Sequence, residues 1–172
     1  GAPAITPDGQ TMYLTVCPVD AQYPRYAEIH SSARSDATWA KPVKLEITSD
    51  TLSSYAHPAV SPDGQWLYFV SDMPGGLGGL DIWRMQLSEH GTGVVENLGA
   101  PINTEGDEMF PTFRPNGDLY FSSTGHPGMG GLDIFCARRD SIHKRWRIEI
   151  LPSPVNSSGD DFGMTFEGVH NR

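Results

Sequence analysis

Three short phrases recur along this chain in the same order and at nearly the same interval. The phrase PDGQWLYF at residues 62–69 returns as PNGDLYF at 115–121, 53 residues later, and an earlier copy, PDGQTMYL, begins 55 residues before it. The phrase GGLDIW at 78–83 returns 52 residues on, and PINTEGDE at 101–108 corresponds to PVNSSGDD 53 residues later. A period of about 50 residues composed of strand-like segments predicts a β-propeller with one blade per repeat.

The second repeat shows what one blade contains. Aromatic and β-branched residues at 66–70 predict a buried strand, and apolar and polar residues alternate at 81–85 as in a half-buried strand. A Pro-Asp-Gly sequence precedes the first of these strands. It predicts a tight turn, because glycine accepts the positive φ that such a turn requires. With short extended runs at 58–61 and 94–98, the repeat holds four strands, which together predict a four-stranded antiparallel blade.

We therefore expect a single all-β domain, a partial β-propeller of about three blades and the first strand of a fourth. The expected blades span residues 2–55, 56–108 and 109–161, and the fourth begins within 162–172. Propellers typically have four to eight blades, so this chain would leave open strand edges, and such edges pair with other strands. We expect the remaining blades or another chain to complete the ring.

The strands at the two ends of this arc, residues 4–6 and 164–166, are expected to take the innermost place in their blades. Apolar residues that recur at the repeat period are expected to pack between blades. They are Ile29, Ile82 and Ile134 in third strands, Leu45, Leu98 and Leu151 near blade ends, and Tyr68 and Tyr120 in second strands.

The two cysteines, Cys17 and Cys136, occupy different positions within their repeats. Their spacing predicts no disulfide, although two cysteines could pair in an oxidising compartment. The preferred interpretation is that both are small buried thiols.

Acidic residues outnumber basic ones by 21 to 12, and the resulting net charge of −9 argues against nucleic-acid binding. One segment departs from this balance, because five of the 12 basic residues fall within 138–147. They are Arg138, Arg139, Lys144, Arg145 and Arg147. This segment is either a solvated hairpin tip or a contact for an acidic partner. No apolar stretch reaches the length of a membrane span, so direct insertion into a membrane is not expected.

The glycine-rich loop at residues 75–81 resembles two kinds of ligand site and matches neither. It is no phosphate loop, because no Gly-Lys-Ser/Thr follows it, and its aspartate comes one residue too late for the calcium β-roll repeat. We expect the glycines to allow a tight loop in which Asp81, and Asp133 in the next repeat, accept hydrogen bonds from nearby amides. The six histidines have no zinc-site spacing, so neither a metal nor a cofactor is expected.

Two pairs of adjacent carboxylates, Asp107-Glu108 and Asp160-Asp161, are the candidates for acid–base or glycosidic chemistry. They recur at corresponding positions of two repeats, and this favours a repeated structural loop over a unique active site. No catalytic residue is therefore predicted, and the chain is not expected to be an enzyme.

The repeat resembles the PD40, or WD40-like, propeller repeat over nearly the whole chain. The resemblance rests on SPDG at 61–64, LYF at 67–69 and DIW at 81–83, with RPNG, LYF and DIF in the next copy. PD40 propellers are known from the periplasmic protein TolB and from Bacteroidetes envelope proteins that join a propeller to an OmpA-like, peptidoglycan-binding domain. The sequence GMGGLDI at 128–134 is most similar to the Bacteroidetes group, which includes an accessory protein of the type IX secretion system.

The resemblance implies a non-catalytic protein-interaction scaffold of the bacterial envelope, periplasmic or associated with the outer membrane. Envelope proteins would be its partners, and a secretion system or peptidoglycan its setting. The first repeat departs from the pattern, because QYPRY at 22–26 replaces the glycine-rich loop and Ser53-Ser54 replaces Gly-Asp. The alternative function is that of a carbohydrate-active hydrolase or lyase with a propeller fold.

In a propeller, the loops from second to third strands and the loops between blades open on one face, and we expect the partner to bind there. The candidate binding residues on these loops are Asp72, Gly76, Gly78, Asp107, Glu108, His126, Gly128, Asp160 and Asp161. The residues expected to maintain the repeat are Asp63, Gly64, Asp81, Asn116, Gly117 and Asp133. The opposite face would carry the Pro-Asp-Gly turns and the basic segment.

Overall fold

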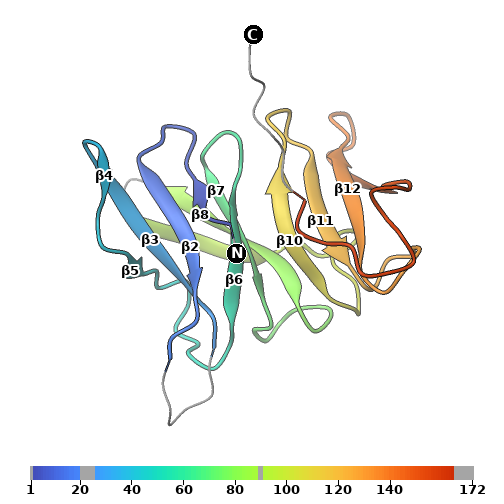
Figure 1. The fold of residues 1–172 in the computed structure, drawn as a ribbon, viewed down its shortest axis with the longest axis horizontal. Helices are drawn as coiled ribbons and strands as arrows, with labels where there is room; N and C mark the ends of the chain where they lie inside the picture. The colour runs from blue at the N-terminus through green and yellow to red at the C-terminus, as the bar shows by residue number, and fades with distance from the viewer. Residues whose placement is uncertain (1, 20–25, 89–90, 165–172) are drawn as a thin grey trace.

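The computed structural model describes residues 2–19, 26–88 and 91–164, which form three antiparallel sheets in succession (Figure 1). We call these sheets blades 1, 2 and 3. Blade 1 contains β1 (Ala4–Ile5), β2 (Thr11–Val16), β3 (Glu28–Ser35), β4 (Thr38–Trp39) and β5 (Val43–Lys44). Blade 2 contains β6 (Tyr55–Val60), β7 (Trp66–Ser71), β8 (Asp81–Ser88) and β9 (Gly91–Asn97). Blade 3 contains β10 (Glu108–Phe113), β11 (Leu119–Ser123), β12 (Asp133–Arg139) and β13 (Trp146–Ile150).

Strands follow one another in chain order within each blade, and all paired neighbours are antiparallel. Blade 1 keeps this order through β4, and β5 returns to pair with β3. The predicted all-β partial propeller of antiparallel blades is confirmed, and the part of the chain described contains no helix, and so none able to span a membrane. β1 holds the first place in its sheet, as expected of residues 4–6. Residues 165–166, expected to open a fourth blade, lie outside the described residues.

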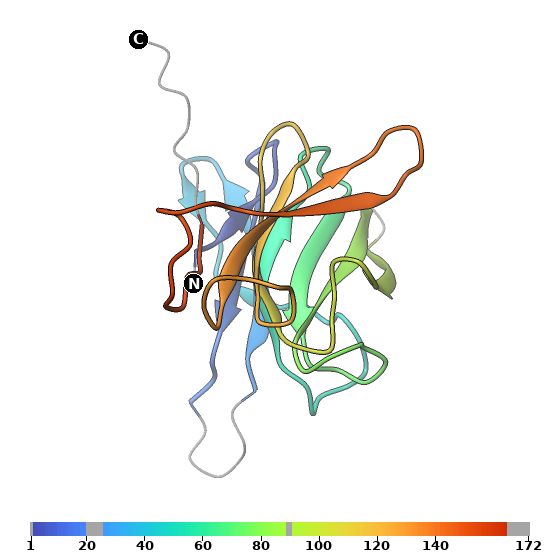
Figure 2. The same cartoon turned by 90° about the vertical axis from the view of Figure 1, so that its right-hand side faces the viewer.

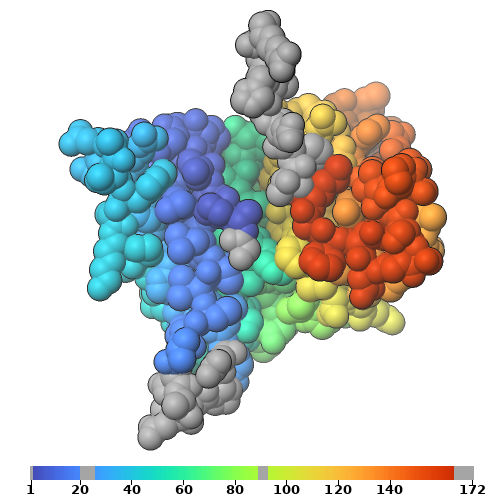
Figure 3. All heavy atoms as spheres, viewed as in Figure 1, coloured from blue at the N-terminus to red at the C-terminus, as the bar shows by residue number. Residues whose placement is uncertain are grey.

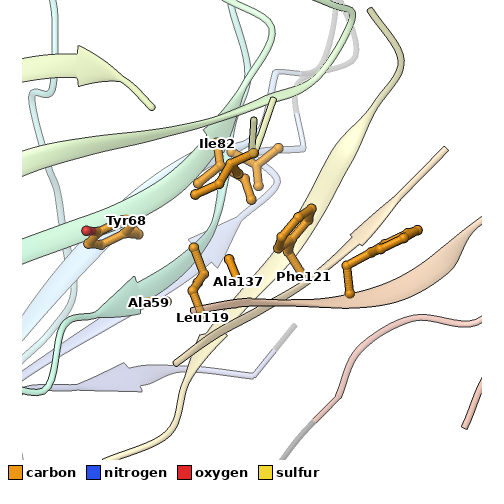
Figure 4. Close-up of a cluster of buried hydrophobic side chains, with 9 residues drawn as sticks. Ala59, Tyr68, Ile82, Leu119, Phe121 and Ala137 are labelled. Atoms are coloured by element: carbon orange, nitrogen blue, oxygen red, sulfur yellow. The ribbon is translucent and has the colours of Figure 1, made fainter. Parts of the chain in front are cut away.

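Blade 2 is apolar on both faces, because successive side chains of a strand point to opposite sides of the sheet. Phe69 packs in one cluster with Ile29 of blade 1. Tyr68, its neighbour in β7, packs in another cluster with Leu119 and Phe121 of blade 3, as Figure 4 shows. A strand that is buried on both faces needs a continuous apolar run, and this accounts for the sequence WLYFV at residues 66–70.

The face of blade 3 that turns away from blade 2 carries a third cluster. Tyr120, Ile134 and Cys136 are buried there, with Leu151 and Met164 packed against them. The chain that follows β13 runs back across this face, and it is seen in red in Figure 2. The recurring isoleucines and tyrosines are therefore core residues, as predicted. Leu98 and Leu151 are only partly buried, because both belong to segments that leave the sheet.

The two cysteines differ in their surroundings. Cys136 lies in the middle of β12 and is buried, whereas Cys17 follows the last residue of β2 and is exposed. The expectation of a buried thiol at Cys17 is therefore wrong, because the strand ends one residue earlier and its next side chain reaches solvent. Both cysteines are free thiols.

The Pro-Asp-Gly turns join the first and second strands of each blade. In blade 2 the Asp63 carboxylate accepts hydrogen bonds from the Ser61 hydroxyl at 2.6 Å and from the Gln65 amide at 3.0 Å, and Gly64 takes a φ of 73°. The Ser61 hydroxyl bond, followed by the Gln65 amide bond, lowers the pKa of Asp63. In blade 3 Asn116 replaces the aspartate, and its Oδ1 accepts the amide two residues on at 3.0 Å.

Replacing Ile82 by alanine is expected to lower the free energy of unfolding by about 2–5 kcal/mol. The side chain is 0% exposed between blades 2 and 3, so its removal leaves a cavity. Leu98→Ala removes a similar volume from a half-buried position and should cost less. Urea unfolding followed by tryptophan fluorescence measures both values. Equal losses for the two variants would show that the core between these blades has been misplaced.

Candidate functional site

The first strands of the three blades meet around a groove of about 460 Å³ at the centre of the arc. We call it the axial groove. It is lined by residues 2–5, 57–60, 110–113 and 162–164, so each repeat contributes the corresponding part of its chain. In Figure 3 the dark blue N-terminal residues and the red C-terminal segment border the middle of the face, with yellow residues of blade 3 between them.

A β-bulge interrupts the first strand of blades 2 and 3 at the edge of this groove. The pairing register shifts between Ala56 and Ala59 in blade 2, and between Met109 and Thr112 in blade 3. The bulges contain His57 and Phe110, which have φ values of 49° and 54° and stand 53 residues apart. Residues other than glycine rarely adopt this left-handed backbone conformation, which costs them on the order of 1–2 kcal/mol each.

Gly163 stands another 53 residues after Phe110 and has a φ of 74°. The left-handed position is therefore a property of the repeat rather than of one residue. Glycine occupies it without strain, so the histidine and phenylalanine found in blades 2 and 3 are retained against a conformational cost. Bulges often re-aim a side chain toward a functional site.

The strained residues form a stack of rings along the groove. The rings of His57 and Phe110 lie 4.0 Å apart and nearly parallel, and Phe162 stacks on Phe110 at 5.3 Å. The backbone amide of Phe110 donates a hydrogen bond to Nδ1 of His57 at 3.3 Å, and the amide of His57 donates to the Thr15 hydroxyl at 3.1 Å. These contacts connect the first strands of blades 2 and 3 with each other and with β2 of blade 1.

No role is predicted from the sequence for His57, Phe110 or Phe162. A usable signal was present, because an aromatic ring followed by proline recurs at 57–58 and 110–111. A residue before proline is restricted in conformation, so the recurrence marks a special backbone site.

Burial lowers the pKa of His57, so its neutral form is favoured in the folded protein. The unfolded chain then binds more protons than the folded protein below the ordinary histidine pKa of about 6.5. Stability should consequently fall as the pH drops below that value. We expect His57→Phe, which copies the residue at the equivalent position of blade 3, to remove this part of the pH dependence.

The measurement is the free energy of unfolding between about pH 7.5 and about pH 5.5, a window in which exposed carboxylates stay ionised. His143→Gln, a change at an exposed hairpin position, serves as the control and should keep the dependence of the parent protein. An unchanged slope in the His57→Phe variant would mean that His57 is protonated in the folded state as easily as in the unfolded chain.

On the face where a partner was expected, the loops are held by hydrogen bonds within the molecule. Asp81 accepts from the amides of Leu77 and Gly78 at 2.5 and 3.2 Å, and Asp133 accepts from Met129 and Gly130 at 2.9 and 3.0 Å. The hydrogen bonds expected of these two aspartates are thus present, and each carboxylate holds a glycine-rich loop in shape.

The glycines of these loops allow close contacts between backbone segments. A Cβ atom at Gly78 would overlap the carbonyl oxygen of Gly106, which belongs to the segment that crosses to blade 3. At the corresponding place Gly130 meets the carbonyl of Gly159. Gly76 and Gly128 in turn leave room for the carboxylates of Asp81 and Asp133. Gly76, Gly78 and Gly128 are exposed and Gly130 is half-buried, and at all four the absence of a side chain allows contacts within the molecule.

The paired carboxylates are likewise engaged in local structure. Asp107 accepts the amide of Leu80 at 2.8 Å and Asp160 accepts that of Leu132 at 3.0 Å, so each joins a crossing segment to the preceding glycine-rich loop. Asp161 accepts the amide and hydroxyl of Ser157 at 2.7 and 3.0 Å.

Glu108 does not belong to an exposed acidic rim. It is 0% exposed, and its carboxylate accepts hydrogen bonds from the amide and hydroxyl of Thr104 and from the hydroxyl of Ser123. The expectation of a binding role at the surface is wrong for this residue. Two adjacent carboxylates in a strand-initial loop point to opposite sides, and in blade 3 only the first of them faces out.

Two further candidates have structural partners. The carboxylate of Asp72 accepts the amide of Ser54 at 2.8 Å, which ties the second-to-third-strand loop of blade 2 to the segment that crosses from blade 1. His126 is half-buried beside Phe121 and Phe135, and its Nε2 lies 2.8 Å from the carbonyl oxygen of Ile102. A binding role for either remains a proposal.

Asn103 and Asn156, which lie at corresponding positions of the crossing segments, have a structural role that the repeat pattern did not predict. The side-chain amide of Asn103 accepts the N–H of Ile82 and donates to its carbonyl, both at 2.8 Å. Asn156 makes the same pair of bonds with Ile134 at 2.7 and 2.8 Å. Both asparagines are buried, so each side chain substitutes for a neighbouring strand beside the third strand of its blade.

Among residues 2–19, 26–88 and 91–164, no three His, Cys, Asp or Glu side chains gather closely enough to hold a metal ion. The carboxylates of the glycine-rich loops are satisfied by backbone amides, and this is the arrangement expected of a structural loop.

Gly78→Ala is expected to destabilise the protein by at least about 2 kcal/mol, because its Cβ meets backbone rather than a movable side chain. Gly159→Ala is the matched control in a crossing segment, since its Cβ has only ordinary contacts and no positive φ. Thermal unfolding by circular dichroism compares the two. A Gly78→Ala protein as stable as the Gly159→Ala protein would contradict the close approach of loop and crossing segment.

No family profile matches this chain, and no curated protein matches it by sequence. Solved structures do match it by shape. A protein assigned as TolB in Agrobacterium tumefaciens superposes with a TM-score of 0.55 and 22% identity, over 84% of this chain and 47% of that one. TolB from Acinetobacter baumannii gives a TM-score of 0.54 and 21% identity, over 91% and 34% of the two chains.

A puromycin-hydrolysing peptidase from Mycobacterium tuberculosis is also similar, with a TM-score of 0.52, 19% identity and coverage of 93% of this chain and 24% of the other. The chain thus spans less than half the length of each of these structures. At these identities the likeness shows a shared fold, that of the TolB-type β-propellers.

Proposed function

We propose that this protein is a non-catalytic protein-interaction module of the bacterial envelope, periplasmic or associated with the outer membrane, and that it binds a partner in the axial groove. The observation that carries the proposal is the ring stack of His57, Phe110 and Phe162, two members of which are held at a conformational cost. The fold shared with TolB structures and the resemblance to PD40 envelope proteins support the setting.

The groove suits an extended segment of a partner protein. Its lining is mostly apolar and comes from the first strands of three blades, so an occupant would contact several repeats at once. Aromatic side chains at the centre of a groove supply most of the binding energy at many interfaces. Phe162 is 58% exposed, so its ring offers apolar surface that a partner would cover.

Further blades, from the same chain or another, would complete the ring in this proposal, with the segment from residue 162 opening the fourth. The segment that follows blade 3 leaves Val155 40% exposed. A terminal repeat needs a cover for such surface. An added blade would provide it, and it would also close the axial groove on the side that is now open.

We base the more specific role, in a secretion system or at peptidoglycan, on the sequence GMGGLDI at 128–134. Co-sedimentation with purified peptidoglycan tests one branch of it directly. Binding of the protein to the pellet, with release by muramidase treatment, would favour the peptidoglycan-associated role. Recovery of the protein in the supernatant would contradict the peptidoglycan-associated role and leave the role in a secretion system.

Phe162→Ala is expected to weaken partner capture from envelope extract by about tenfold, because it removes an exposed ring from the groove. Leu52→Ala is the control, since it removes an exposed apolar side chain outside the groove. Quantitative pulldown at several extract dilutions measures the loss. Equal recovery by both variants would place the partner elsewhere on the molecule.

The alternative is a carbohydrate-active hydrolase or lyase, and one of the structures that share the fold is that of a hydrolase, a peptidase. We expect no turnover of chromogenic glycosides or of peptide amides by the purified protein. Turnover that disappears when one exposed carboxylate, such as Asp72 or Asp160, is changed to its amide would overturn the non-catalytic proposal. A contaminating enzyme is recognised because its activity would not respond to the substitution.

A further inference from the structure

A second groove lies between blades 2 and 3, on the face that carries the Pro-Asp-Gly turns. It has a volume of about 400 Å³ and is walled by the rings of Trp66, Tyr68, Phe113 and Trp146. Tyr68 and Phe113 meet edge to face, with ring centres 4.7 Å apart. Asp63 and residues 115–118 form the end nearest the turns. We call it the interblade groove, and it shares no lining residue with the axial groove except Phe113.

An arginine lies over each of the two tryptophans in its walls. The guanidinium of Arg84 lies 3.9 Å from the centre of the Trp66 ring and also pairs with Glu96. The guanidinium of Arg139 lies 5.8 Å from the centre of the Trp146 ring. A guanidinium held on an aromatic face keeps its N–H groups free to bind a carboxylate in a bidentate manner.

The groove continues into a second hollow at the tip of the β12–β13 hairpin. That hollow, of about 490 Å³, is lined by residues 138–141 and 145–147, and it shares Arg139 and Trp146 with the interblade groove. Figure 2 shows the hairpin extending outward from the body of the protein. One surface therefore runs from the turns of blades 2 and 3 to the basic hairpin.

The positive charge of this hairpin is only partly neutralised. Arg138 and Arg147 pair with Glu149, and Arg138 also reaches Asp118 at 3.5 Å. Among the residues that the structure describes, Arg139, Lys144 and Arg145 have no carboxylate within ion-pair distance, and all three are exposed. Asp140, the acidic residue of the hairpin loop, is occupied by His143 at 2.7 Å.

We propose that the interblade groove and the basic hairpin together bind an acidic peptide segment that carries an aromatic or large apolar side chain. The apolar side chain would enter between the rings of Tyr68, Phe113 and Trp146, and flanking carboxylates would pair with Arg139 and Arg145. This surface shares only Phe113 with the axial groove, and the proposal does not depend on the function proposed for that groove.

The distribution of charge favours a short peptide over a long polyanion. Five basic residues and one acidic residue lie within 138–147, whereas the rest of the chain holds 20 acidic and seven basic residues. A long polyanion that extended beyond the hairpin would meet this negative surface, and Asp63 lies at the far end of the groove. A peptide can place its carboxylates at the hairpin and its uncharged part at the turns.

The test measures fluorescence anisotropy of a labelled peptide, Glu-Asp-Glu-Phe-Glu-Asp-Glu, titrated with the protein. We expect the Arg139→Gln/Arg145→Gln variant to bind at least about tenfold more weakly than the parent, and affinity to fall between about 50 mM and about 300 mM salt. Replacing phenylalanine by serine in the peptide should weaken binding as well, because the rings then lose their contact.

The matched control is Arg34→Gln/Lys41→Gln, which removes the same charge from blade 1. Arg34 lies 5.9 Å from the centre of the Trp39 ring, so it reproduces an arginine–tryptophan stack outside the groove. Equal affinity of the two double variants, or no binding of the acidic peptide, would overturn the proposal. Equal affinity for the serine peptide, or for linear polyphosphate, would show a general anion site in place of the peptide site.

Discussion

The crossing segments between blades are held by side chains that bond to the backbone as a strand would. Asn103 pairs with both polar groups of Ile82, and Asp107 accepts the amide of Leu80, so one segment is fixed to blade 2 at two points before blade 3 begins. Asn156 and Asp160 repeat the arrangement. The start of each blade is thereby set relative to the blade before it. The axial groove depends on this placement, because its walls are the strands that follow the crossing segments.

The same arrangement explains why glycine and buried polar residues dominate the face opposite the turns. Backbone segments approach so closely at Gly78 and Gly130 that a side chain has no room. Such proximity leaves amide groups without water, and the carboxylates of Asp81 and Asp133 provide the partners that they need. The glycine-rich loops and crossing segments, which the sequence suggests as a binding face, therefore mainly form contacts that join the blades.

The repeat period was enough to predict the fold, because a propeller is built from copies of one unit and each copy supports the interpretation of the others. The apolar positions could also be predicted, since Ile82 and Ile134 occupy matching places in matching strands. The site could not. Spacing alone does not reveal whether a carboxylate such as Glu108 faces solvent or a threonine hydroxyl. The proline after His57 indicates a restricted backbone there, but its left-handed conformation depends on how the first strand bulges within its sheet.

The left-handed position carries three different residues in one chain, histidine, phenylalanine and glycine, on the same backbone conformation. His57 and Phe110 lie in the first strands of blades 2 and 3, and Gly163 follows blade 3, so the same conformation is held in three different surroundings. Because the position recurs, the backbone conformation is common to the copies, whereas the side chain that lines the groove differs from one copy to the next. A substitution at one copy changes the side chains that line the groove. Replacing the glycine by an aromatic residue would add a ring at the conformational cost of the left-handed backbone. The left-handed position is thus a place where the side chains that line the groove can change while the fold stays the same.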